Sequence, residues 1–119
     1  DEFVNYHRAL GFEQFFVYDN SDGFEMQQWG KQKGDYVEVI HFPGQSKQMP
    51  SYNDCAKRTK AAGIFKWVAF FDIDEFLVLK KHGHVSDMLE DHCKSGALAV
   101  NWLMFEYNGW NIPFFEPVT

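Results

Sequence analysis

Apolar positions recur along the chain in two spacings, one typical of helices and one typical of buried strands. Near the start, Phe3, Val4, His7 and Leu10 fall three or four positions apart, and Gly11 follows as a helix stop. Short apolar runs mark strands instead, because a strand inside a parallel sheet is buried on both faces. On these spacings we predict helices over 3–10, 24–33, 51–62 and 86–94, and strands over 15–18, 36–40, 67–71 and 97–105.

Helices and strands therefore alternate along the chain. Ser51 and Ser86 are the expected caps of the last two helices, and Gly34, Gly63 and Gly96 are the expected stops. Alternation of this kind favours an α/β layered domain with a largely parallel sheet.

Composition narrows the class of protein. The chain has 119 residues, which predicts a single domain over 1–119. It is 45% apolar and 18% aromatic, so we expect a globular protein with an aromatic interior. A net charge of −6 leaves no basic surface to neutralise phosphates, so a nucleic-acid partner is not expected. No apolar run approaches the roughly 20 residues of a membrane span.

Two cysteines, Cys55 and Cys93, lie outside any zinc-binding spacing. Two buried free thiols are the favoured interpretation, and one disulfide between them stays open. His7 falls on the apolar side of the first helix and is expected to be a hydrogen-bonded core histidine. His82 and His84 are expected in an exposed loop.

Acidic residues follow two of the predicted strands. Asp72 and Asp74 come directly after the strand at 67–71, and Asp19 and Asn20 come after the strand at 15–18. Ligands bind beyond the carboxyl ends of the strands in open α/β sheets, so the two turns are expected to border one crevice. An Asp-x-Asp pair offers hard oxygen ligands that suit Mg²⁺ or Mn²⁺ beside a diphosphate. From the pattern alone, the alternative that both acids merely end a strand and cap a turn stays open.

Aromatic and amide side chains gather near the end of the sequence. Trp102 and Trp110 stand among Asn101, Asn108 and Asn111. Aromatic faces beside amides suit sugar rings, which stack their C–H faces and hydrogen-bond at their edges. Core packing explains at least half of the aromatics here, and the two tryptophans remain candidates for acceptor binding.

Four blocks in order carry a resemblance to a known family. "NYHRALGFEQFFVYDNSD", "SYNDCAKRT", "WVAFFDIDEFL" and "VNWLMFEYNGW" together resemble glycosyltransferase family 92 and its relatives in the family 2 superfamily. The resemblance implies a GT-A fold, with a Rossmann-like sheet that binds a nucleotide sugar, and an inverting transferase. It also implies a nucleotide-sugar donor, UDP-sugar being the expected one, and a carbohydrate acceptor.

The resemblance assigns roles to residues by position. Asp72 and Asp74 are expected to hold Mn²⁺ or Mg²⁺ on the donor diphosphate, with Asp74 the more direct ligand and Asp72 also near the ribose. Asp19 and Asn20 are expected to face the base and ribose. Gln48 and Asn53 would border the donor pocket. The first strand of such a fold and its catalytic base are expected outside this chain, so the domain is expected to be incomplete at both ends.

Two other functions share part of this pattern. One alternative is a non-catalytic domain that binds nucleotide sugar or glycan, since the same site residues would serve binding without turnover. A haloacid-dehalogenase-type phosphatase also places Asp-x-Asp after an apolar strand, but it expects Thr or Val where this chain has Phe76. The resemblance implies one of two locations: family members are often Golgi-lumenal with a membrane anchor, whereas bacterial relatives are cytoplasmic. The sequence of this chain does not distinguish these locations.

Overall fold

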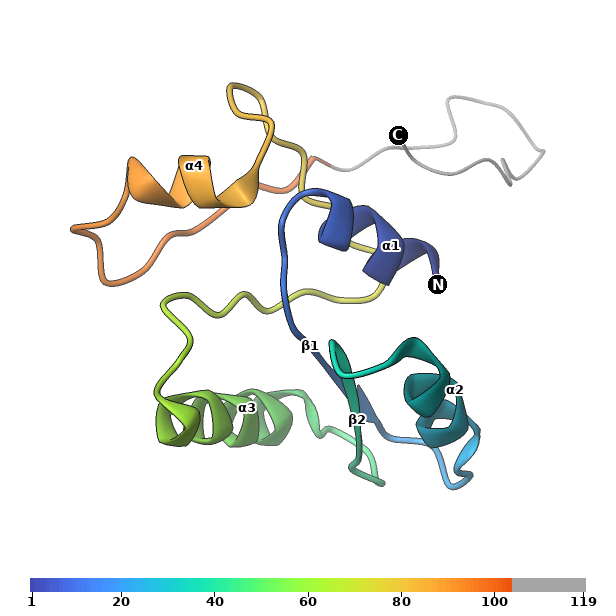
Figure 1. Cartoon of the computed structure of the whole chain (residues 1–119). Helices are drawn as coiled ribbons and strands as arrows, with labels where there is room; N and C mark the ends of the chain where they lie inside the picture. Colours follow the sequence, from blue (N-terminus) through green and yellow to red (C-terminus); the bar gives the residue numbers. More distant parts are fainter. Residues whose placement is uncertain (104–119) are drawn as a thin grey trace, which may run out of the picture. The chain divides into compact units, whose positions relative to one another are not determined.

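The computed structural model describes residues 1–103, and predictions that fall on 104–119 lie outside the described residues. In chain order, the described elements are α1 (Glu2–Ala9), β1 (Phe15–Asp19), α2 (Glu25–Lys33), β2 (Val37–His41), α3 (Gln48–Ala62) and α4 (Val85–Glu90) (Figure 1). They fall into two compact units. Among the described residues, one comprises Asp1–Gly11 together with residues 76–103, and the other comprises Phe12–Glu75. The prediction of a single domain stays a prediction.

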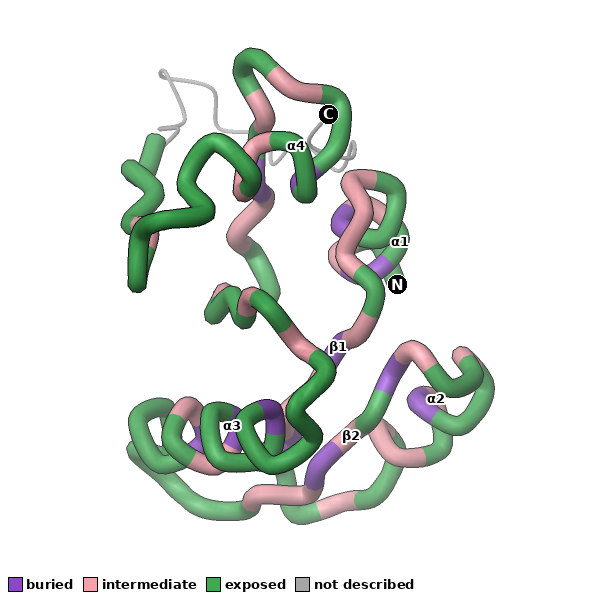
Figure 2. Tube along the Cα trace, turned by 60° about the vertical axis from the view of Figure 1, so that its left-hand side comes forward, coloured by how far each residue is buried: buried purple, intermediate pink, exposed green. Residues whose placement is uncertain are grey.

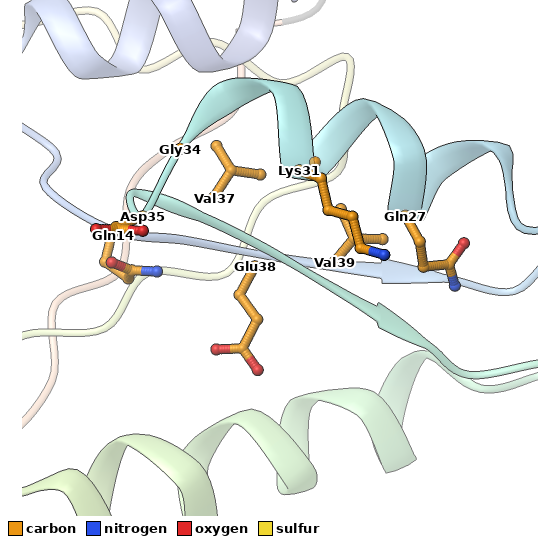
Figure 3. Close-up of a pocket in the computed structure, with 9 residues that line it drawn as sticks. Gln14, Gln27, Lys31, Gly34, Asp35, Val37, Glu38 and Val39 are labelled. Atoms are coloured by element: carbon orange, nitrogen blue, oxygen red, sulfur yellow. The ribbon is translucent and has the colours of Figure 1, made fainter.

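The larger unit is built around a parallel strand pair. β1 and β2 run side by side with Phe15 opposite Val37 and Asp19 opposite His41. Parallel strands need a crossover, which α2 provides. α2 and α3 lie on opposite sides of the pair (Figure 3), and buried positions mark β1, β2 and α3 (Figure 2). Helices on both faces of a parallel pair confirm the α/β class.

α3 begins earlier than its sequence suggests. It starts at Gln48, so the prediction that Ser51 caps it is wrong: Ser51 is buried inside the helix, and its hydroxyl donates to the Gln48 carbonyl at 2.7 Å. In the sequence, Pro50 indicates the end of a loop that precedes the helix. A proline in the first helical turn is well tolerated, however, because N–H groups there have no intrahelical partner. The predicted stop is confirmed, since Gly63 adopts the left-handed conformation at φ 68°.

The strand predicted over 67–71 is wrong. The described sheet has two strands, and this segment is in neither. Val68 and Phe70 are 38% and 43% exposed. Aromatic side chains hold the neighbourhood in place, with the Phe70 ring 4.5 Å from Tyr52 and the Phe65 ring 5.9 Å from Phe16. An apolar run indicates a tendency to be buried, but a strand also needs a neighbour with which to pair.

The last two predicted elements also differ from the structure. Residues 97–103 form no strand, and Trp102 and Leu103 are exposed; 104 and 105 lie outside the described residues. The predicted helix over 86–94 is shorter, and ends at Glu90 before a turn. Its cap is His84, not Ser86: the His84 Nδ1 atom accepts the Ser86 N–H at 3.3 Å, because an imidazole nitrogen can replace a hydroxyl as acceptor.

The smaller unit is organised around α1 and confirms the core histidine. His7 is fully buried. Its Nδ1–H donates to the Phe3 carbonyl at 2.9 Å, while Nε2 accepts the Leu77 N–H at 3.2 Å. Tyr6 donates its hydroxyl to the Leu77 carbonyl at 2.8 Å, and the Phe76 ring stacks on the His7 ring at 5.7 Å. Side chains of α1 thus take the place of a partner strand for Leu77.

Both cysteines are free. Cys55 is buried as expected, and burial raises the pKa of its thiol. The expectation of a second buried thiol is wrong, because Cys93 lies exposed in the turn after α4. No helix in the described part of the chain combines the length and apolar character needed to cross a membrane.

Candidate functional site

Asp72 and Asp74 lie in one exposed turn over residues 72–75. The Glu75 N–H donates to the Asp72 carbonyl at 3.0 Å, and the Asp72 N–H donates to Oε2 of Glu75 at 2.8 Å. Both aspartates are exposed, so their carboxylates face solvent from the same short loop. Three hard oxygen donors, those of Asp72, Asp74 and Glu75, thus lie within four residues.

Gln48, at the start of α3, reaches this turn. Its Nε2 donates to Oδ1 of Asp72 at 3.3 Å and to the Tyr52 hydroxyl at 3.1 Å. The structure therefore brings together two residues that the sequence placed in the donor site, although they are 24 positions apart. Asn53 is exposed on α3, and lies in the same helix as Gln48.

Asp19 ends β1 and is buried. The residue is 8% exposed. Its Oδ1 atom accepts the Ser21 N–H at 3.1 Å, and Oδ2 is buried without a hydrogen-bond partner in the described residues. The main-chain carbonyl of Asp19 accepts the Phe42 N–H at 2.7 Å, which ties the turn to the end of β2. Asn20 is exposed. A buried, unsatisfied carboxylate oxygen is costly, so this position has capacity for a donor group.

In the described part of the chain, neither a hydrogen bond nor an ion pair joins the two turns. Over residues 1–103, no hydrogen bond or ion pair links Asp19 or Asn20 to Asp72 or Asp74. Within the same range, no three side chains of His, Cys, Asp or Glu gather closely enough to hold a metal ion. The shared crevice stays a prediction. Trp102 is exposed in the other unit, and Trp110 lies outside the described residues.

A charged cluster on α3 lies next to the strand pair. The Tyr18 hydroxyl donates to Oδ2 of Asp54 at 2.6 Å, and Arg58 donates to the same oxygen at 2.6 Å. Burial and the Asp54 carboxylate raise the pKa of Tyr18, while the Tyr18 and Arg58 hydrogen bonds lower the pKa of Asp54. In the sequence, Asp54 stands three residues after Ser51, a spacing that indicates only a partial helix cap. Its contact with β1 depends on strand–helix packing, which local sequence does not encode.

A hollow of about 520 Å³ lies beside α2 and β2 (Figure 3). Its lining includes Gln14, Gln27, Lys31, Asp35 and Glu38. None of the described residues expected in the donor site lines it, so we do not place the site there.

The sequence does not identify Tyr52 as part of this site. It predicts that Glu75 either supports the two aspartates or stabilises their turn, and its bonds with Asp72 confirm the contact within the turn. Glu75 stands three positions after Asp72, a spacing at which a carboxylate can accept a main-chain N–H in a turn. That signal is present in the sequence. Tyr52 had no such signal, because its role depends on where Gln48 and Phe70 lie.

A sequence model of glycosyltransferase family 92 matches residues 2–116, which is nearly the whole chain and includes both polar turns. The chain belongs to glycosyltransferase family 92.

Plant members of family 92 are similar to it. A family 92 protein of Ricinus communis is 33% identical over 94 residues, 76% of this chain and 16% of its own length. One of Arabidopsis thaliana is 30% identical over 114 residues, covering 93% of this chain and 18% of its own. One of Oryza sativa subsp. japonica is 31% identical over 94 residues, with shares of 76% and 16%.

This family 92 chain thus spans about a sixth of the length of the curated relatives it matches. No solved structure matches it.

Proposed function

We propose that this protein transfers a hexosyl group from a nucleoside-diphosphate sugar, with UDP as the nucleotide, to a hydroxyl of a glycan or related acceptor. The observation that carries the proposal is the family 92 match over residues 2–116. The match includes the acidic turn over 72–75 and the turn that follows β1.

The proposed fold is GT-A, a Rossmann-like sheet with helices on both faces. Its support is the segment from β1 to β2, which forms a parallel pair with α2 as crossover. Asp19 ends β1 at the carboxyl edge of that pair, where open α/β sheets bind their ligands.

A divalent cation, Mn²⁺ or Mg²⁺, fits the donors in the acidic turn. Such ions bind one or two carboxylates, keep several waters and take further oxygens from substrate phosphates. Asp72 and Asp74 supply two carboxylates, and that number does not require a third protein ligand. When bound, the cation would stabilise the charge on the departing nucleoside diphosphate.

The chain's own side chains would bind and orient the donor. Gln48 holds Asp72 through Oδ1 and so fixes one carboxylate edge. The Oδ2 atom of Asp19 is an unused acceptor for an N–H or O–H of the base or ribose. Asn20 and Asn53 are exposed amides that complete the proposed donor set, and Trp102 and Trp110 are the proposed acceptor residues. We assign no general base within the described residues. Inversion at the anomeric carbon belongs to this proposal.

The test is calorimetric titration of the full-length protein with UDP, with and without Mn²⁺, beside Asp74→Ala. Asp35→Ala is the matched control, because Asp35 is exposed and lies outside the acidic turn. We expect Mn²⁺ to strengthen UDP binding, and Asp74→Ala to weaken it at least about tenfold, or about 1.4 kcal/mol. Asp35→Ala should bind as the unmodified protein does.

If neither Mn²⁺ nor Asp74→Ala changes the affinity for UDP, the proposed metal site is wrong. The alternative is a non-catalytic binding domain. It would be favoured if UDP binding depends on Mn²⁺ but no UDP is released from any UDP-sugar with a panel of acceptors.

A further inference from the structure

Two hydrogen bonds between Asp72 and Glu75 close the turn over residues 72–75, and each residue donates one of them. The Glu75 N–H donates to the Asp72 carbonyl, and the Glu75 carboxylate accepts the Asp72 N–H, at 3.0 and 2.8 Å respectively. The second bond is charge-assisted, and such bonds are stronger than those between neutral groups. One residue therefore binds both main-chain groups of Asp72.

Charge repulsion alone does not explain the position of the Glu75 carboxylate. Three carboxylates within four residues repel one another. The Glu75 carboxylate nevertheless returns to the start of the turn, where an N–H donor compensates its charge. The Oε2 atom thereby accepts a main-chain hydrogen bond within the turn.

The two aspartates are fixed to different degrees. Asp72 is held at its main chain by Glu75 and at its side chain by Gln48. Asp74 makes no hydrogen bond or ion pair within residues 1–103. The position of the Asp74 carboxylate therefore depends on the shape of the turn that carries it.

We infer that Glu75 is a positioning residue, which closes the turn and so holds the Asp72 and Asp74 carboxylates in place for a divalent cation. The inference rests on the proposed function. It gives the third acid a role different from that of the other two: Glu75 acts on the main chain and does not touch the cation.

Two substitutions separate this role from that of a ligand. In Glu75→Gln the side-chain carbonyl still accepts the Asp72 N–H, whereas an amide is a weak metal ligand. In Glu75→Ala the acceptor is lost. Glu13→Ala is the control: it removes the same charge at an exposed position that precedes β1 in the same unit.

The first readout needs no metal. Amide hydrogen exchange of the full-length protein is followed on peptides that cover Asp72. Because the Asp72 amide would lose its acceptor, we expect faster exchange in Glu75→Ala, and exchange close to the unmodified rate in Glu75→Gln and Glu13→Ala. Equal exchange in all four proteins would overturn the inference.

The second readout is Mn²⁺ affinity in the presence of UDP. Loss of a residue that orients metal ligands typically weakens metal binding by about tenfold or more, which is the effect expected for Glu75→Ala. Glu75→Gln should remain within about threefold of the unmodified protein. If Glu75→Gln loses as much affinity as Glu75→Ala, Glu75 acts through its charge or as a ligand, and the inference is wrong.

The two readouts also separate this inference from the proposed function. If the unmodified protein binds no Mn²⁺ with UDP, the proposed function fails and the metal role of Glu75 fails with it. The exchange result would then still decide whether Glu75 orders the turn.

Discussion

At the scale of single residues, His7 is the clearest case in which one side chain fixes a distant segment. Its Nδ1–H is directed to the Phe3 carbonyl and its Nε2 to the Leu77 N–H, 70 positions away. These bonds require a neutral imidazole with the proton on Nδ1. Burial lowers the pKa of His7, which favours the same neutral form.

Stability should therefore depend on pH through His7. The unfolded chain binds a proton at a pKa of about 6.5, whereas the folded chain resists protonation until the pH is lower. The unfolded state then holds more protons below about pH 6.5, so the free energy of unfolding should be highest above that pH and fall as the pH decreases below it. Urea unfolding between pH 5 and 8 measures this.

The matching variant is His7→Phe, which keeps a ring but leaves the Leu77 N–H without its acceptor. We expect a loss of about 1–3 kcal/mol at pH 7.5 and a weaker pH dependence. The exposed His92 provides the control, since His92→Phe should change neither. A pH dependence that persists in His7→Phe would assign it to another group.

Local sequence patterns predicted two of these residue-scale features. The position of His7 on the apolar side of a helix predicted burial, and the acids of the 72–75 turn were evident from their spacing. The sequence placed Gln48 and Asp72 in the same donor site, but it did not predict the hydrogen bond between them. A hydrogen bond between residues 24 positions apart is set by packing of α3 against the chain that follows it.

At the scale of elements, α2 approaches β2 most closely at Gly30. Gly30 is buried, and a Cβ atom there would lie 2.5 Å from Cγ2 of Val39. Val39 is β-branched and has few rotamers to which it can move. Glycine is thus required by close packing at this position, and not by an unusual backbone conformation.

Gly30→Ala should destabilise the chain even though alanine is the better helix former by about 1 kcal/mol. We expect a net loss of about 1–2 kcal/mol from the overpacked contact, and a partial recovery in Gly30→Ala combined with Val39→Ala. Thermal unfolding reports both. Gly83→Ala is the control, because a Cβ there meets nothing within 4 Å. A stabilised Gly30→Ala would show that the helix can move away from the strand.

The elements that sequence predicted well are those with a complete local signal. α1 has a clear helical period, β1 and β2 are short apolar or β-branched runs, and Gly11 and Gly34 mark the ends of α1 and α2. The segment at 67–71 has the apolar composition of a strand, but composition carries no information about a pairing partner. The start of α3 was misplaced because Pro50 resembles a boundary when it lies inside a first turn.

At the scale of the whole chain, large apolar side chains remain exposed in the larger unit. Ile64 is 78% exposed and Ile73 is 71% exposed, and Phe70 and Met49 are exposed as well. Exposed apolar surface binds the dye ANS, so the chain of residues 1–119 should enhance its fluorescence. Replacing Ile64 and Ile73 by Ser should reduce that signal and change stability by less than about 0.5 kcal/mol.

The control for this pair is Ser at Lys57 and Lys60, two exposed positions of α3, which should leave dye binding unchanged. A large loss of stability in the isoleucine double variant would mean that these side chains are buried in solution. Neither the division into two units nor this exposure was predicted, since both depend on contacts summed over the whole chain.

The two cysteines make the chain chemically asymmetric. Cys93 lies exposed in one unit, while Cys55 is buried in the other and its thiol has a raised pKa. Thiolates, not thiols, react with alkylating reagents, so a maleimide applied to the folded chain labels one position in one unit. The second thiol becomes reactive only when the larger unit opens. The natural sequence thus contains both an attachment point for a fluorophore and an internal reporter of unfolding, without any engineered residue.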